Sequence, residues 1–153
     1  MRLLLPILLI FFSCVNHTEK KHYPLPTKAS YLDSIKAESK MAFILFHHQI
    51  QKMSVVAKEY QDRRQIDSLF GYIGQISNDT SCLKGGMFNY FGQLNLCKDS
   101  SVSDPIAELH FVLEGNCEGF YLQSGNYLNR YVLTAAGKKF LLELYEPFKK
   151  KLK

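Results

Sequence analysis

The stretch AELHFVLEGNCEGFYLQSGNYLNRYVL, residues 107–133, decides the fold class. Apolar and polar side chains alternate over 107–113, which is the pattern of a half-buried strand. Two further strand-like runs, at 119–123 and 127–133, each follow a turn signal that contains glycine. Because these strands follow one another without intervening helices, they predict an antiparallel sheet in an α+β fold.

Downstream of this stretch, residues 134–148 predict a closing helix. Thr134 is a suitable N-terminal cap. The expected apolar face of the helix consists of Ala136, Phe140, Leu141, Leu144 and Phe148. Pro147 should end the helix or kink its last turn.

Upstream, residues 66–77 fit either a helix or a strand. Their apolar spacing suits a helical face, but Gly71 and Gly74 would each cost about 1 kcal/mol relative to alanine there. The segment LFGYIGQI at 69–76 also resembles MFNYFGQL at 87–94. We therefore favour two strands that form a hairpin across the polar loop between them.

Residues 30–64 predict a long helix that begins at a Ser30–Asp33 cap pair. Its apolar residues recur at spacings of three, four or multiples of seven. Residues 41–46 are apolar all round, so we expect the middle of this helix to be buried on more than one side, with a break near His47-His48. The predicted fold is a long N-terminal helix, a meander of about five antiparallel strands and a C-terminal helix.

The first thirteen residues have the organisation of a secretory signal peptide. Arg2 provides a basic start, and an apolar run at 3–12 is too short to span a bilayer as a helix. The following motif FFSC at 11–14 resembles the lipobox of bacterial lipoproteins, although Phe11 stands where that family usually has leucine. The resemblance implies cleavage before Cys14 and attachment of lipid to its thiol and its new amino group. The alternative is an ordinary cleaved signal with a cysteine near the cut.

These features divide the chain into a signal peptide at 1–13, a lipidated cysteine and flexible tether at 14–28, and one α+β domain at 29–153. The tether is polar, contains two prolines and shows no periodicity. In bacterial lipoprotein sorting, an aspartate after the cysteine retains the protein in the inner membrane. By this resemblance, Val15 at that position indicates the outer membrane. The expected partners are therefore a membrane, through Cys14, and a protein of the cell envelope.

Composition limits the possible functions. Hydrophobic residues make up 46% of the chain and charged residues 22%, as in a folded globular protein. Loss of residues 1–13 removes only Arg2, which leaves 18 basic and 14 acidic residues. This mild excess is far from the basic stripe of a nucleic-acid-binding protein. The basic tail FKKKLK at 148–153 is expected to be a solvated helix end, with contact to anionic lipid heads as the alternative.

Three cysteines follow the expected cleavage site, and export would expose them to an oxidising compartment. If residues 86–97 form one strand, its ends lie more than about 30 Å apart. Cys82 and Cys97 are then too distant to bond. An antiparallel strand after Pro105 would return Cys117 to the end where Cys82 lies. We therefore predict a Cys82–Cys117 disulfide and a buried or free Cys97.

The sequence contains few candidates for catalysis or metal binding. Cys97 could act as a nucleophile with His110 or His48 as its base, but no nucleophile signature surrounds it. Adjacent histidines on a helix point apart, so His47-His48 is expected to lie on the surface without binding a metal. Glu114 and Glu118 are expected to be solvated turn residues. HExxH, CxxC, GxSxG and phosphate-loop motifs are absent, so no cofactor, metal site or catalytic residue is predicted.

These observations suggest a non-enzymatic binding or accessory module of the cell envelope. An envelope-anchored inhibitor or immunity-type protein fits the same features. A small periplasmic enzyme is the third alternative, and it requires Cys97 or a carboxylate pair to be exposed in a cleft.

Overall fold

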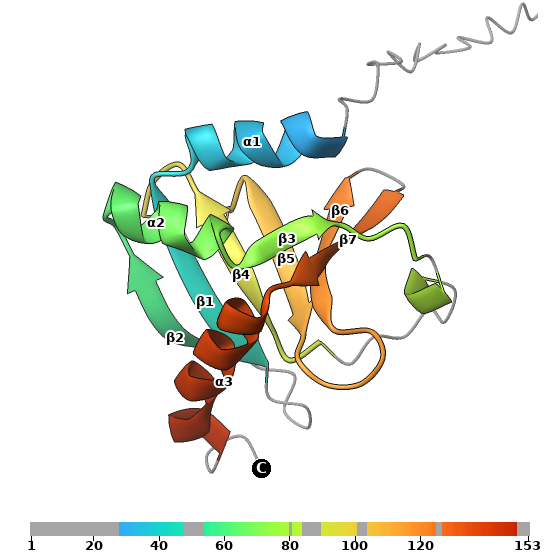
Figure 1. Cartoon of the computed structure of the whole chain (residues 1–153). Coiled ribbons are helices and arrows are strands. Elements are labelled where there is room, and N and C mark those ends of the chain that lie inside the picture. Colours follow the sequence, from blue (N-terminus) through green and yellow to red (C-terminus); the bar gives the residue numbers. More distant parts are fainter. Residues whose placement is uncertain are drawn as a thin grey trace, which may run out of the picture.

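A computed structural model describes residues 28–47, 54–79, 81–83, 90–100, 104–124 and 127–149. Within these ranges, seven strands form one antiparallel sheet in the order β2-β1-β4-β5-β6-β7-β3 (Figure 1). The elements are α1 (Lys28–Glu38), β1 (Met41–His47), β2 (Ser54–Tyr60), α2 (Arg63–Phe70), β3 (Ile73–Ile76), η1 (Ser81–Leu83), β4 (Gly92–Cys97), β5 (Ala107–Val112), β6 (Gly119–Ser124), β7 (Tyr127–Leu133) and α3 (Ala135–Lys149).

The predicted long helix over residues 30–64 is wrong, because α1 ends at Glu38. The hydroxyl of Ser39 donates a 2.6 Å hydrogen bond to the carbonyl of Ile35. Arg63, at the start of α2, donates to the carbonyl of Lys36 at 2.8 Å and to that of Ser39 at 3.3 Å. These bonds satisfy carbonyl groups that the end of a helix leaves without partners. Arg63 is 24 residues away from Ser39 in sequence, so a tertiary contact stabilises this end of α1.

The apolar run at 41–46 is buried as expected, but it forms the inner strand β1. Ala42, Ile44 and Phe46 face the main core. Met41, Phe43 and Leu45 face the other way and form a second cluster with Cys97. A strand buried on both faces has no polar alternation, so periodicity could not distinguish it from a buried helix.

The predicted hairpin between residues 69–76 and 87–94 is also wrong. The first segment is divided between α2 and β3, and β3 pairs with β7. In the second segment, residues 92–94 belong to β4, which lies between β1 and β5. Asp62 caps α2 because its carboxylate accepts hydrogen bonds from the backbone N–H groups of Arg64 and Gln65, at 2.7 and 3.3 Å.

The five-stranded meander is corrected to a larger sheet. Strands β4 to β7 do run as a meander, and β5, β6 and β7 occupy the stretch 107–133 as predicted. The β1–β2 hairpin extends the sheet on one side and β3 forms the opposite edge. After β7, the Thr134 hydroxyl accepts a 3.1 Å hydrogen bond from the Gly137 N–H and caps α3 as predicted. Ala136, by contrast, is exposed.

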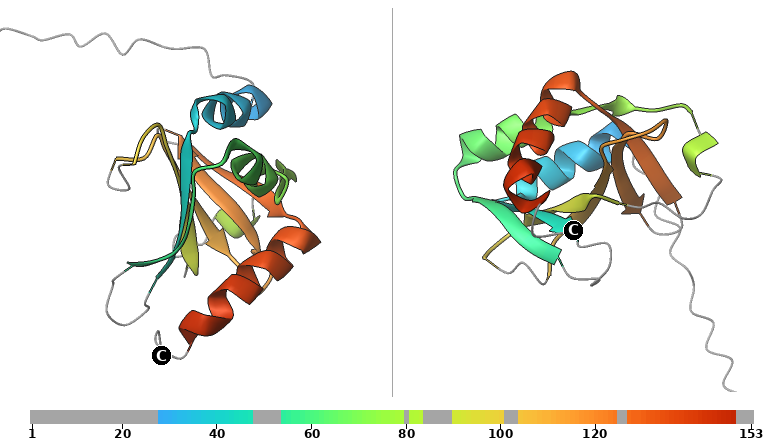
Figure 2. Two further views of the ribbon diagram at one scale, coloured as in Figure 1. Left: turned by 90° about the vertical axis from the view of Figure 1, so that its left-hand side faces the viewer. Right: turned by 90° about the horizontal axis from the view of Figure 1, so that it is seen from below.

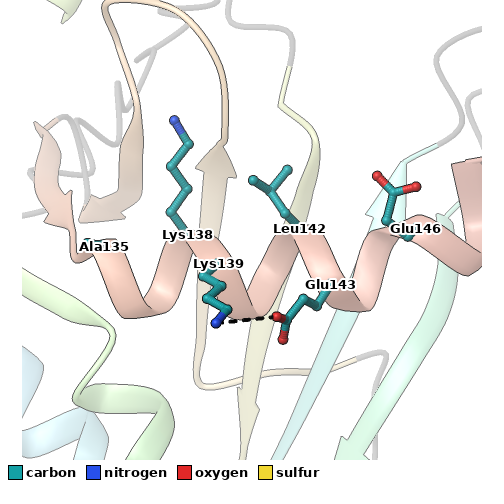
Figure 3. A pocket seen from close by; sticks show the side chains of 6 residues that line it. All are labelled: Ala135, Lys138, Lys139, Leu142, Glu143 and Glu146. Carbon is teal, nitrogen blue, oxygen red and sulfur yellow. Dashed lines mark ion pairs between the residues drawn. The ribbon is translucent and has the colours of Figure 1, made fainter.

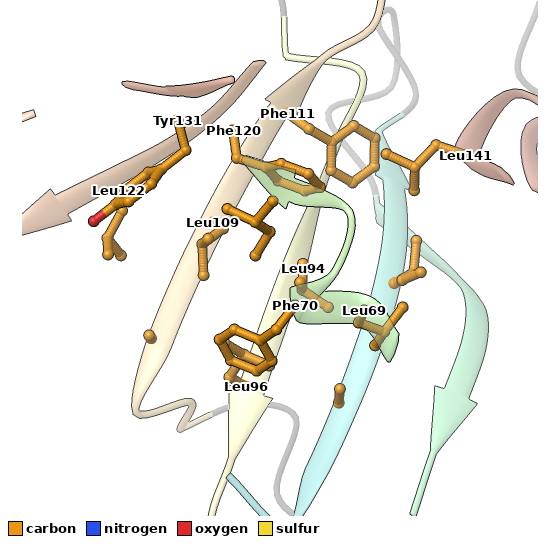
Figure 4. Packing of buried hydrophobic residues seen from close by; sticks show 14 of the residues in the cluster. Leu69, Phe70, Leu94, Leu96, Leu109, Phe111, Phe120, Leu122, Tyr131 and Leu141 are labelled. Atoms are coloured by element: carbon orange, nitrogen blue, oxygen red, sulfur yellow. The ribbon is translucent and has the colours of Figure 1, made fainter. Parts of the chain in front are cut away.

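The main core lies between the sheet and its helices. Figure 2 shows α1, α2 and α3 on the same side of a curved sheet. Figure 4 shows side chains from several strands meeting Leu69 and Phe70 of α2 and Leu141 of α3. Phe46 is at an aromatic junction, with its ring centre 5.8 Å from that of Phe111 and 5.0 Å from that of Tyr145. Burial of these apolar groups is the main source of stability.

Gly92 allows β1 and β4 to approach closely beside this core. A side-chain carbon at position 92 would overlap the carbonyl oxygen of Leu45 and lie 2.6 Å from the Phe111 ring. The close packing of β1 and the Phe111 ring therefore leaves room only for glycine at position 92.

Candidate functional site

A row of imidazole and phenol rings crosses the sheet on the face opposite the helices. We call His47, Tyr90, His110 and Tyr121 the histidine–tyrosine row. Leu109 and Phe111 of β5 face the main core, so His110 between them faces the other side. The same alternation in β6 places Tyr121 there, between the core residues Phe120 and Leu122.

Ring contacts connect the four members of the row. The Tyr90 ring stacks on that of His110, with ring centres 4.6 Å apart. Tyr90 also lies 5.8 Å from Tyr121 between ring centres, and His47 lies 6.2 Å from His110. The row therefore extends from the end of β1 to β6, across the intervening strands β4 and β5.

His47 lies at the end of the row nearest the edge strand β2. Its Nδ1 is 2.8 Å from the hydroxyl of Ser54, its cross-strand partner. Burial lowers the pKa of His47, and the neighbouring His110 lowers it further, whereas Glu108 opposes the shift. The imidazole is therefore more readily neutral than an ordinary histidine side chain.

His110 is in the middle of the row. Its Nε2 lies 3.9 Å from the carboxylate of Glu108, which precedes it on the same face of β5. Its Nδ1 is buried and has no hydrogen-bond partner among the described residues. Burial lowers the pKa of His110, although Glu108 opposes this shift as well.

Tyr121 connects the row to the disulfide. The side chain of Tyr121 is fully buried, and its hydroxyl donates a 2.6 Å hydrogen bond to the carbonyl of Cys117. Burial raises the pKa of Tyr121. Burial also raises the pKa of Tyr90, and the neighbouring Tyr121 raises it further. Both tyrosines therefore remain protonated at neutral pH.

Cys82 and Cys117 are at disulfide distance, with their Cα atoms 5.5 Å apart. The structure therefore contains the cysteine pair that the strand order predicted. This link joins η1 to the turn between β5 and β6, and the two cysteines are 35 positions apart in sequence. The other predicted site residue, Cys14, lies outside the described residues.

Arg130 of β7 contacts residues that are close to the two disulfide cysteines in sequence. Only 12% of its side chain is exposed. Its Nη2 and Nε donate to the carbonyl of Glu118 at 2.9 and 3.3 Å, and its Nη1 lies 3.6 Å from the carboxylate of Asp79. The Glu118 carboxylate pairs with Lys138 of α3 at 2.5 Å, while Glu114 is exposed. These contacts hold the turn in place and do not form an acid–base pair of Glu114 and Glu118.

The structure places the Cys97 thiol away from solvent. The residue is fully buried beside Met41, Phe43 and Leu45, and it is a free cysteine. Burial raises the pKa of the thiol, and the nearby carboxylates of Asp99, Asp104 and Glu108 raise it further. A thiol in such surroundings is a poor nucleophile at neutral pH. His48, its other suggested base, lies outside the described residues.

A shallow depression lies along one face of α3 (Figure 3). Its lining residues are Ala135, Lys138, Lys139, Leu142, Glu143 and Glu146. All of them come from one helix, and the exposed Lys139 and Glu143 form an ion pair of 3.9 Å. An open surface with charges of both signs lacks the enclosure and convergent polar groups that are typical of a small-molecule site.

Sequence reasoning did not predict the histidine–tyrosine row. The sequence predicts His47 on a helix surface, and it places Tyr90 and Tyr121 within strands. His110 did have a usable signal, because it occupies a polar-face position in the alternating strand 107–113. Identification of its neighbours required the strand order, which places residue 110 beside residues 93 and 121.

Comparisons with known proteins give no functional assignment for this chain. No family model matches the chain, and no curated protein or solved structure matches it either. Among the described residues, no group of three or more histidine, cysteine or carboxylate side chains is arranged to hold a metal ion. The described helices include none that is long and apolar enough to cross a membrane.

Proposed function

We propose that this protein is a lipid-anchored lipoprotein of the bacterial cell envelope, held in the outer membrane through Cys14, and that its domain is a non-enzymatic binding module. The observation that carries the second part is the partly exposed portion of the histidine–tyrosine row, His47, Tyr90 and His110, on the sheet face opposite the helices. Aromatic side chains with polar ends are enriched at protein interfaces, because they offer a large contact area together with a hydrogen-bonding group. The proposed partner is another protein of the envelope.

Two features favour binding over catalysis. The thiol of Cys97, the nucleophile that the sequence suggested, is buried in an apolar cluster. The exposed Glu108 is next to the row and has a side chain that is 46% exposed, so it suits the polar rim of an interface.

Site-specific crosslinking tests the binding face. A photoreactive benzophenone side chain would replace Glu108 beside the row, or Lys139 on α3 as a matched exposed control. Irradiation of intact cells should produce a discrete protein adduct from position 108 and none from position 139. Tyr90→Ser in the same chain should reduce the adduct from position 108. Equal adducts from both positions, or none from position 108, would contradict the proposed face.

The anchor requires a separate test. Mass spectrometry of protein extracted from membranes with detergent should find an acylated N-terminal peptide that begins at Cys14. Cys14→Ser should abolish this modification and release the protein from the membrane fraction. An unmodified Cys14 in protein that is already soluble would contradict the anchor without affecting the proposed binding face.

A further inference from the structure

The sheet holds the rings of His47 and His110 close together. His47 is the last residue of β1, and its N–H donates a 2.9 Å hydrogen bond to the carbonyl of Phe91. His110 is inside β5 and pairs with Gln93 on one side and Tyr121 on the other. The 6.2 Å between the ring centres is therefore set by paired strands, and stacking of Tyr90 further restrains the His110 ring.

Each ring has a polar group at one nitrogen. The Ser54 hydroxyl is at Nδ1 of His47, and the Glu108 carboxylate is nearest Nε2 of His110. In metal sites, a hydrogen bond such as that between Ser54 and His47 fixes the tautomer of a histidine and directs its other nitrogen toward the ion. The Glu108 carboxylate, 3.9 Å from His110, is beyond hydrogen-bond distance and acts on the ring through its charge. Here the other nitrogens are Nε2 of His47 and the buried Nδ1 of His110, which has no hydrogen-bond partner among the described residues.

The ring separation is about 1 Å longer than the separation around one tetrahedral ion. Zinc–imidazole bonds of about 2.0–2.1 Å at the tetrahedral angle place the centres of two rings roughly 5.2 Å apart. Rotation of the two side chains from the observed 6.2 Å would bring the rings to that spacing. Imidazole nitrogen binds zinc, copper and nickel well, whereas calcium and magnesium prefer oxygen ligands.

We propose that His47 and His110 form a two-histidine site for a divalent transition-metal ion such as Zn²⁺, with the remaining coordination positions open. Since the described residues supply no third ligand, water or a group from a partner completes the coordination. The site needs neither the lipid anchor nor the protein partner of the proposed function. Failure of the crosslinking test and failure of metal binding are therefore separate results.

Zinc titration of the full mature chain tests this site. The chain carries His17→Gln and His22→Gln, which remove the histidines of the tether, and chelator treatment first removes bound metal. Competition with a chromophoric chelator should detect one Zn²⁺ per chain. His47→Gln and His110→Gln should each weaken binding by at least about tenfold, in line with the cost of disturbing a metal site. His48→Gln, at the neighbouring position in sequence, is the matched control and should leave the affinity unchanged.

A measurement on the unsubstituted mature chain, which retains all five histidines, covers the case in which a variant does not fold. Nitrogen-15 NMR of the imidazole groups should show zinc-dependent shifts of His47 and His110 and not of His48. Circular dichroism would establish that each variant used in the titration is folded. Undiminished affinity in both folded variants, or zinc-dependent shifts confined to other histidines, would overturn the proposal.

Discussion

The hydroxyl of Tyr121 donates a 2.6 Å hydrogen bond to the carbonyl oxygen of Cys117. This bond joins a fully buried ring in β6 to the turn that contains the disulfide. The Tyr121 ring also contacts that of Tyr90. The histidine–tyrosine row and the Cys82–Cys117 link are thus adjacent parts of one structural unit.

Tyr121→Phe should lower the free energy of unfolding by about 1 kcal/mol, because it removes one hydrogen bond and leaves the Cys117 carbonyl without this donor. Urea denaturation would measure the change. The matched control is Tyr145→Phe, since the described part of the structure records ring contacts but no hydrogen bond for the Tyr145 hydroxyl. Equal losses in both variants would show that the Tyr121 bond contributes no specific stability.

Removal of the disulfide should cost more. Cys82 and Cys117 are 35 positions apart in sequence. For a loop of this length, the chain-entropy model gives a stabilisation of roughly 4 kcal/mol. The double variant Cys82→Ser and Cys117→Ser should therefore unfold at a lower urea concentration than the oxidised protein. A reducing agent should destabilise the unmodified protein and leave the double variant unchanged. If reduction has no effect on the unmodified protein, the link does not contribute to its stability.

Gly92→Ala should lower the free energy of unfolding by at least about 3 kcal/mol, or prevent folding, because the new methyl group overlaps backbone at Leu45 and the Phe111 ring. Gly115→Ala is the comparison. Position 115 has open space around it, but its φ of 88° costs an alanine roughly 1–2 kcal/mol. Thermal unfolding of both variants would measure the difference. A smaller effect at position 92 than at position 115 would show that β1 and β4 can separate without loss of the core.

Stability of the metal-free protein should fall on acidification because of His47 and His110. Burial is the main cause of the lowered pKa values in the fold. In the unfolded chain, histidine takes up its proton near pH 6.5, at about its ordinary pKa. As pH falls through that value, the unfolded state therefore binds more protons and the free energy of unfolding decreases. The loss is complete only below the folded-state pKa.

Urea midpoints between about pH 7.5 and about pH 5.5 test this prediction, since the window spans the ordinary histidine pKa. The double variant His47→Gln and His110→Gln should show a shallower decrease than the unmodified protein. The prediction fails if the two proteins lose the same stability over this range.

Local sequence signals were sufficient near the end of the chain. Alternation in residues 107–133 and the intervening turns predicted β5, β6 and β7, and Thr134 marked the start of α3. Other local signals oppose a single helix over residues 30–64. Asp62 is a suitable helix cap, and Val55-Val56 are β-branched residues that favour a strand.

The sequence by itself determined the strands whose two faces differ, because alternation then reports which side chains are buried. It also determined the cysteine pair, since antiparallel strand direction brings Cys117 back toward Cys82. Only the tertiary structure decided that residues 41–47 form a strand, because both faces of β1 are covered and the apolar run has no period. The meeting of His47 with His110 was likewise a tertiary result, since it depends on β4 lying between β1 and β5.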